Sequence, residues 1–216
     1  MTTRREVTTA MLSSAVLTAA GGTARAAEPV KLPAPVTGGG LPLMEALKAR
    51  HSTREYAARA LAPQTLADLL WAAFGVNRPS GDRTAPYWRH VMVIDVYLAM
   101  ADGVWLYEPQ THTLQPYLAD DLRAQTGMQD FVATVPLNLV YVAHGERMKD
   151  VTEEERRLYA SVDAACIGQN VYLYCASAGL GSVFRGAVDT HRLGALLKLP
   201  AGQFVTFAQS VGYPRA

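Results

Sequence analysis

The chain has 216 residues, half of them hydrophobic and 18% charged, with a formal net charge of +1 at pH 7. This length and composition fit a single globular domain with a sizeable core, and they exclude a disordered or fibrous chain. The near-neutral charge and the scattered basic residues exclude the electrostatic footprint of a nucleic-acid-binding protein.

Residues 1–26 have the pattern of an export signal. Arginines at positions 4 and 5 precede an uncharged apolar run, Ala10 to Ala20, and Ala24-Arg25-Ala26 matches a cleavage site. The apolar run is too short to span a bilayer, so we expect no stable membrane anchor. The paired arginines favour the twin-arginine route, which exports folded proteins, and therefore a periplasmic or exported protein. A general secretory signal is the alternative.

The first half of the mature chain predicts an arm, two helices and a hairpin. Residues 27–40, rich in proline and glycine, predict an extended N-terminal arm, and a single domain then spans 41–216. Helical spacing of apolar residues and prolines at the first turn predict helices over 42–50 and 63–74. Residues 91–100 and 103–108 predict two strands joined at Asp102-Gly103. A short extended piece is expected within 108–118.

The second half predicts a long helix between strands. Two short helices are expected within 118–134, followed by a strand over 136–143 that is apolar enough to be covered on both faces. Thr152 and Glu155 form a capping box at the start of a helix that ends before Gly179. A strand over 182–188, a helix over 191–199 and a strand over 203–213 complete the chain. The order predicts an α+β fold with one sheet and helices packed against it.

Cysteine and histidine spacing predicts neither a disulfide nor a metal site. Cys166 and Cys175 fall on one predicted helix, about 13 Å apart by its rise, whereas a disulfide needs Cα atoms within about 7 Å. The five histidines show no ligand spacing with each other or with the cysteines.

Three segments carry candidate chemistry. RHSTREY places Arg50, Ser52 and Arg54 at alternating positions, which suits a phosphate group because guanidinium donates paired hydrogen bonds; a solvated basic face is the alternative. GLGSVFRG, residues 179–186, brings glycines to a strand, so that a main-chain amide at Arg185 or Gly186 can meet a planar ligand; helix termination and tight packing are the alternative. PYWRH, residues 86–90, is either a site or ordinary packing at a strand entrance.

Together these segments resemble the nitroreductase-like FMN-dependent oxidoreductases, closest to the SagB-type dehydrogenases. The resemblance runs from Leu41 to Pro214. Its carriers, in order, are RHSTREY, LADLLWAAFGVNRPSGDRTAP, IDVYLAMADGVWLYEPQTHTL, DAACIGQNVYLYCASAGLGSVFRGAVD and LPAGQFVTFAQSVGYP. The fold it implies is a central, mostly antiparallel sheet flanked by helices, with a long central helix, in an obligate homodimer that holds two FMN molecules at the subunit interface.

The resemblance also implies roles for individual residues. Arg50, Ser52 and Arg54 match the motif that holds the flavin phosphate and ribityl chain, and Arg215 is expected near the phosphate. The amides of Arg185 and Gly186 match the segment that faces flavin N5.

Residues 86–90 fall in a loop that, in the family, reaches the flavin of the other subunit across the dimer interface. This loop departs from the family pattern. Pro86 is retained, whereas Tyr87 and Trp88 replace small residues and His90 stands where an amide side chain is expected. Trp88 can stack on a ring, and His90 and Tyr87 are the candidate proton donors or acceptors.

These observations predict an exported FMN-dependent oxidoreductase. It would exchange a hydride between flavin N5 and a small organic substrate in ping-pong order, with an electron donor or acceptor that the sequence does not name. One alternative is a flavin-free or inert binding protein, in which the bulky loop fills the substrate space. Another is a cytoplasmic NAD(P)H-dependent nitro or quinone reductase.

Overall fold

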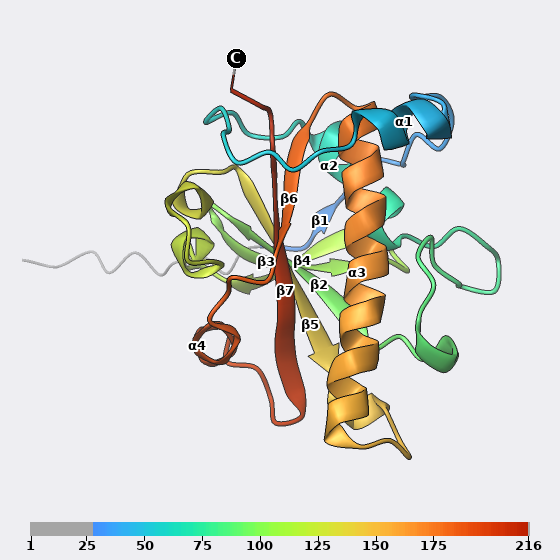
Figure 1. The fold of residues 1–216 in the computed structure, drawn as a ribbon, viewed down its shortest axis with the longest axis vertical. Helices are drawn as coiled ribbons and strands as arrows, with labels where there is room; N and C mark the ends of the chain where they lie inside the picture. The colour runs from blue at the N-terminus through green and yellow to red at the C-terminus, as the bar shows by residue number, and fades with distance from the viewer. Residues whose placement is uncertain (1–27, 216) are drawn as a thin grey trace, which may run out of the picture.

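A computed structural model describes residues 28–215 (Figure 1). The predicted export signal therefore lies outside the described residues. The described residues form one seven-stranded sheet in the order β1-β4-β3-β2-β5-β7-β6, and every pairing in it is antiparallel. Its strands are β1 (Val30–Lys31), β2 (Ile94–Met100), β3 (Gly103–Glu108), β4 (Thr113–Leu118), β5 (Leu137–His144), β6 (Gly181–Arg185) and β7 (Gln203–Gly212).

Within residues 28–215, four α-helices and four short 3₁₀ helices accompany the sheet. The α-helices are α1 (Leu43–Ala49), α2 (Pro63–Phe74), α3 (Glu153–Ser177) and α4 (Thr190–Leu196). The 3₁₀ helices are η1 (Trp88–His90), η2 (Arg123–Gln125), η3 (Asp130–Ala133) and η4 (Gly145–Arg147). The α+β fold with a long helix and an antiparallel sheet is confirmed.

The central strand β5 shows how the two faces of the sheet are covered. Every residue of β5 is buried, as its apolar sequence predicts. Side chains alternate along a strand, so Leu139 and Tyr141 join the core beneath α2 and α3, while Val140 and Val142 join a smaller core beneath α4. Figure 1 shows α3 standing along one face of the sheet and α4 on the opposite side.

The long helix begins where its capping box predicts. The Glu155 N–H donates to Thr152 Oγ1 at 3.2 Å, and the Thr152 N–H donates to the Glu155 carboxylate at 2.8 Å. The apolar face of this helix is only partly covered, however. Val162 of this helix is 50% exposed, and Leu158 is 57% exposed. Among residues 28–215, no helix has both the length and the apolarity to cross a bilayer.

The N-terminal arm contributes a strand that its sequence does not signal. Val30 and Lys31 pair with Leu114 and Thr113 of β4, and Leu32 is buried just beyond them. Because an open strand edge exposes unpaired backbone groups, this short pairing protects β4. Cys166 and Cys175 are both free, as their predicted separation requires.

Candidate functional site

The segment that follows α1 contacts α3 at Tyr172. Ser52 Oγ lies 2.8 Å from the hydroxyl of Tyr172, and the Arg50 guanidinium lies 5.2 Å from the centre of its ring. The same hydroxyl accepts the Phe184 N–H of β6 at 2.8 Å. Tyr172 thus brings two of the three predicted phosphate ligands together and ties them to the β6 edge of the sheet.

The neighbouring residue Thr53 explains why a glycine begins β6. The Thr53 N–H donates to the Ser182 carbonyl at 2.9 Å, so this segment runs directly against the strand. A Cβ added at Gly181 would stand 2.7 Å from Thr53 Cγ2, closer than any side chain tolerates. Thr53 is directed toward the strand, and Ser52 and Arg54 on either side of it are exposed.

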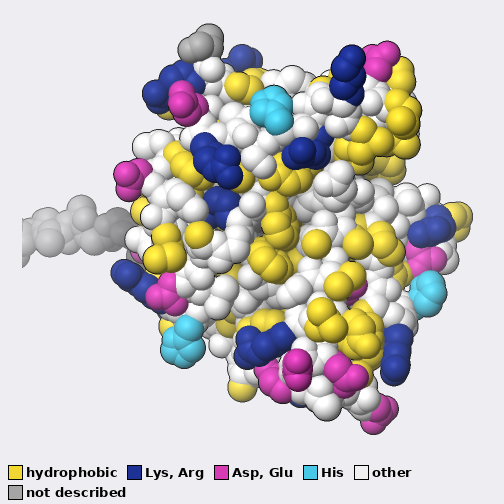
Figure 2. Space-filling model, in the orientation of Figure 1, with side chains coloured by type: hydrophobic (Ala, Val, Ile, Leu, Met, Phe, Trp, Pro, Cys, Tyr) yellow, Lys and Arg dark blue, Asp and Glu magenta, His cyan; other side chains and the backbone are white. Residues whose placement is uncertain are grey.

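The C-terminal segment joins the same end of the molecule. The Arg215 N–H donates to the Glu55 carbonyl at 3.1 Å, and the Ala57 N–H donates to the Tyr213 carbonyl at 2.9 Å. Arg54 and Arg215 are both exposed there. Figure 2 shows Lys and Arg side chains gathered toward the upper end of this face, over the chain after α1 and the C-terminus. The structure therefore places Arg50, Ser52, Arg54 and Arg215 on adjacent segments.

At the other end of β6, the side chain of Arg185 points into the protein. Arg185 is 4% exposed; its Nη1 donates to the Thr126 carbonyl at 2.8 Å and its Nη2 donates to Asn138 Oδ1 at 3.0 Å. Burial lowers the pKa of Arg185 to about 10. Gly186 follows it and is exposed. Only the main chain here is open to a ligand, while the Arg185 side chain fixes the end of the strand.

The loop before β2 is organised around Asp82, which sequence reasoning missed. The Tyr87 hydroxyl donates to the Asp82 carboxylate, and this bond, together with one from Ser80, holds the pKa of Asp82 below its ordinary value. Burial, and then the bond to Asp82, raise the pKa of Tyr87. His90 Nδ1 lies 3.8 Å from the same carboxylate, and its side chain is 89% exposed. Both predicted proton carriers therefore face one carboxylate.

A second acid, Asp163 on α3, anchors the middle of this loop. The Trp88 N–H donates to Asp163 Oδ2 at 2.9 Å, and the Trp88 ring stacks on Tyr159 with ring centres 6.0 Å apart. Asp163 is only 5% exposed, and burial raises its pKa to about 6. Arg89 and His90, next in the chain, have φ angles of 45° and 58°. This left-handed backbone costs energy for residues other than glycine, so the loop needs such anchors.

The two groups of predicted site residues are separate within one chain. Tyr172 and Asp163 lie nine positions apart on α3, about 13 Å along the helix axis. Arg50, Ser52, Arg54 and Arg215 gather at one end of that helix. Trp88 lies against the middle of that helix, and Pro86, Tyr87 and His90 flank it in the chain, with Pro86 exposed.

The sequence analysis did not predict Asp163, Asp82 or Tyr172 as site residues, and the three differ in how strongly the sequence indicates them. Asp163 is the one acid within a long apolar stretch of α3, which is a signal for a buried functional or anchoring group. Asp82 reads as an ordinary turn residue after Gly81. Tyr172 reads as one more apolar position of the helix, and nothing local links it to Ser52.

Comparisons with known proteins identify the family. A family model described as "Nitroreductase family" matches residues 47–213, and the chain belongs to this family of oxidoreductases. A crystal structure from Ralstonia eutropha JMP134, described as a nitroreductase, is 40% identical with a TM-score of 0.84, covering 89% of this chain and 92% of that one.

Two further relatives are more distant. A protein of Methanocaldococcus jannaschii named as a nitroreductase is 29% identical over 167 residues, 73% of this chain and 84% of its own. The NADPH:FMN oxidoreductase of Vibrio harveyi, solved with NAD+, shares the fold at 21% identity with a TM-score of 0.60, covering 81% of this chain and 69% of that one.

Proposed function

We propose that this chain is an FMN-dependent oxidoreductase that exchanges a hydride between flavin N5 and a small organic substrate in ping-pong order. Within the family we place it beside the SagB-type dehydrogenases. The observation that carries the proposal is the meeting of Arg50 and Ser52 at Tyr172, beside the segments that carry Arg54 and Arg215.

The residues at this edge fit the two parts of FMN. A phosphate needs several donors with positive charge, which the guanidinium groups of Arg50 and Arg54 and the hydroxyl of Ser52 offer. A flat ring needs backbone that it can approach closely. Gly186 provides this, because a Cβ there would have only the Phe207 ring nearby, at 3.6 Å. FMN, when bound, supplies the two-electron exchange, and the protein orients it.

Side chains of the protein itself would position the backbone beside the flavin and carry the proton. The Arg185 side chain holds the end of β6 through Thr126 and Asn138, so that the following amides keep a fixed direction. His90 and Tyr87 hold and move a proton, with Asp82 as their common partner. Because the His90 side chain is 89% exposed, its proton exchanges with solvent when no substrate covers the loop.

A homodimer is part of this proposal. Apolar side chains are exposed on α1 and α3, and Figure 2 shows the α1 group as a yellow patch at the upper right. The exposed residues are Leu43, Met44 and Leu47 of α1 and Leu158 and Val162 of α3. A second copy would bury this patch. Within one chain, about 13 Å of α3 separates the loop of residues 86–90 from the segment of Arg50 and Arg54. In a dimer, the loop of one protomer would lie beside that segment of the other.

Export narrows the choice of redox partner. If residues 1–26 direct the folded protein out of the cytoplasm, NAD(P)H is not its expected donor. We therefore propose that it oxidises its substrate and passes electrons to a quinone, a redox protein or oxygen. An uncleaved N-terminus together with turnover by NAD(P)H would instead support a cytoplasmic nitro or quinone reductase.

The first experiment is an absorption spectrum of the purified protein before and after dithionite. Flavin bands that bleach on reduction, with FMN released on denaturation, are the expected result. Arg54→Gln should weaken FMN binding at least tenfold, the loss of a charge-assisted hydrogen bond. Arg192→Gln on α4, also exposed, is the matched control and should leave binding unchanged. A colourless protein that fails to bind added FMN would refute the proposal and favour a binding protein on this fold.

A further inference from the structure

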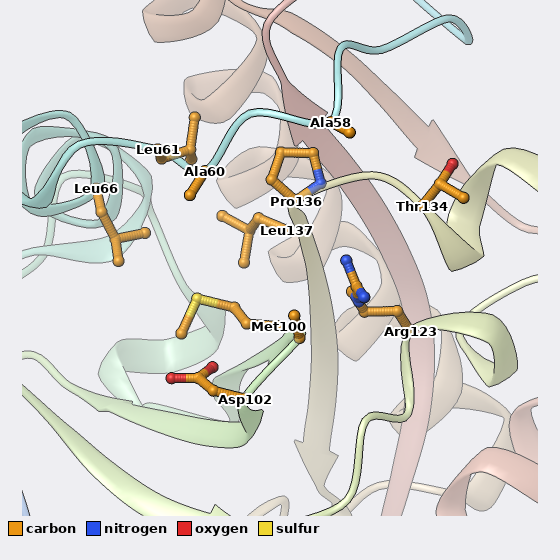
Figure 3. Close-up of a pocket in the computed structure, with 11 residues that line it drawn as sticks. Ala58, Ala60, Leu61, Leu66, Met100, Asp102, Arg123, Thr134, Pro136 and Leu137 are labelled. Atoms are coloured by element: carbon orange, nitrogen blue, oxygen red, sulfur yellow. The ribbon is translucent and has the colours of Figure 1, made fainter.

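The structure has a cavity that none of the predicted flavin residues lines. It has a volume of about 370 Å³ and sits where the β2–β3 turn meets the chain before α2. Its walls are mainly apolar and include Leu61, Leu66, Met100, Pro136 and Leu137 (Figure 3). Size and lining match those of sites for small organic molecules, which are mostly apolar with a few placed polar groups.

One polar group, Arg123, is aimed into this cavity. Figure 3 shows its guanidinium directed toward the centre, opposite Leu61, Leu66 and Met100. Nε and Nη2 donate to the Asp121 carboxylate at 3.0 and 2.8 Å, and Nη1 donates to the Val135 carbonyl at 3.2 Å. Each Nη carries a second N–H. Two donors therefore have no hydrogen-bond partner among residues 28–215 and are available to a ligand.

The surrounding charges select a neutral ligand over an anion. Asp121 already neutralises Arg123 through a two-pronged bond, and the hydrogen bond from Arg123 is the main reason that the pKa of Asp121 lies below its ordinary value. The carboxylate of Asp102 also lines the cavity. A carboxylate ligand would meet both acids, whereas a carbonyl oxygen would accept from Arg123 without adding negative charge.

We propose that this cavity binds neutral, ring-shaped apolar molecules through a carbonyl oxygen that accepts hydrogen bonds from Arg123. The apolar walls bury the ring, and the guanidinium is held in place by Asp121 and Val135 before any ligand arrives. The proposal is independent of the flavin, because it involves neither the segment of Arg50, Ser52 and Arg54 nor the loop before β2.

The test uses three probes with the same naphthalene ring and different heads, titrated into the full-length protein by calorimetry. Acetylnaphthalene offers a carbonyl, ethylnaphthalene offers no acceptor, and naphthoate offers an anion. We expect the acetyl compound to bind about tenfold more tightly than the ethyl compound, which corresponds to one hydrogen bond to a charged donor. Naphthoate should bind most weakly.

Two variants locate the binding. Ala60 is exposed and lines the cavity, so Ala60→Trp should fill it and abolish binding of the acetyl and ethyl compounds. Ala195→Trp, at an exposed position on α4, should leave binding unchanged. Arg123→Met should remove the preference for acetyl over ethyl while the ethyl compound still binds. Unchanged binding in Ala60→Trp, or equal binding of the two compounds to the natural protein, would overturn the proposal; both results are available even if Arg123→Met does not fold.

Discussion

Replacing Asp163 by asparagine should stabilise the protein at neutral and alkaline pH. Asp163 is a carboxylate that is 5% exposed, and its pKa is raised from 3.8 to about 6, with burial as the cause. Between these two values, the folded protein keeps a proton that the unfolded chain has released. Stability therefore falls as the pH rises through this window, and the penalty is complete above about pH 6.

The size of the effect follows from the shift. Two pKa units correspond to about 3 kcal/mol, and we take 2–3 kcal/mol as the range. Asparagine carries no charge, and its side-chain oxygen still accepts the Trp88 N–H. The free energy of unfolding of Asp163→Asn should thus exceed that of the natural protein by about 2–3 kcal/mol near pH 8 and converge with it near pH 4.

Urea unfolding at a series of pH values, followed by tryptophan fluorescence at fixed protein concentration, measures this difference. Asp120→Asn, at an exposed aspartate, is the control and should not change the profile. Asp163→Ala removes the charge and also the acceptor, so it should free the loop and speed tryptic cleavage after Arg89, which Asp163→Asn should not do. An asparagine variant that is no more stable than the natural protein at high pH would refute the argument that burial of the charge is costly.

Three further changes test other contacts. Tyr172→Phe removes the hydroxyl that links Ser52 to β6, and it should cost about 1–2 kcal/mol of stability and weaken FMN binding in a fluorescence titration; unchanged affinity would contradict the role of that link. Gly168→Ala would place a Cβ 2.4 Å from the Phe184 ring and should cost about 1–3 kcal/mol in thermal or urea unfolding. Burial opposes a charge on His144, but its bonds to two carboxylates outweigh burial and raise its pKa, so stability should fall as the pH rises through that raised value. His144→Gln should lack this fall in unfolding experiments above pH 6.5, the ordinary pKa of histidine.

Local signals were enough to predict most of the elements. The Thr152–Glu155 capping box places the start of α3, and an uninterrupted apolar run predicts that β5 is buried on both faces. These features depend on residues close together in the sequence. The two-residue strand β1 was not predicted, because its pairing partner β4 lies about 80 positions away and neither segment alone needs it.

The candidate site was predictable in its residue types but not in its connections. Arg50 and Ser52, which the alternating pattern groups, both contact Tyr172, but nothing in the motif indicates that tyrosine. The inward direction of the Arg185 side chain depends on Thr126 and Asn138, which lie 59 and 47 positions away. The role of Asp163 as an anchor likewise depends on its hydrogen bond from Trp88, which is 75 positions earlier. Such contacts exist only once the sheet and α3 have packed.

The position of β1 decides how the protein can be attached to a surface. β1 and β6 are the opposite edges of the sheet, six strand spacings of about 4.8 Å apart, or roughly 29 Å. A tether joined ahead of residue 28 would start at the β1 edge, away from the segment of Arg50, Ser52 and Arg54. A tether after residue 215 would instead start beside Glu55, one residue from Arg54. Immobilisation on an electrode should therefore use the N-terminal side, which leaves the β6 edge facing the solution.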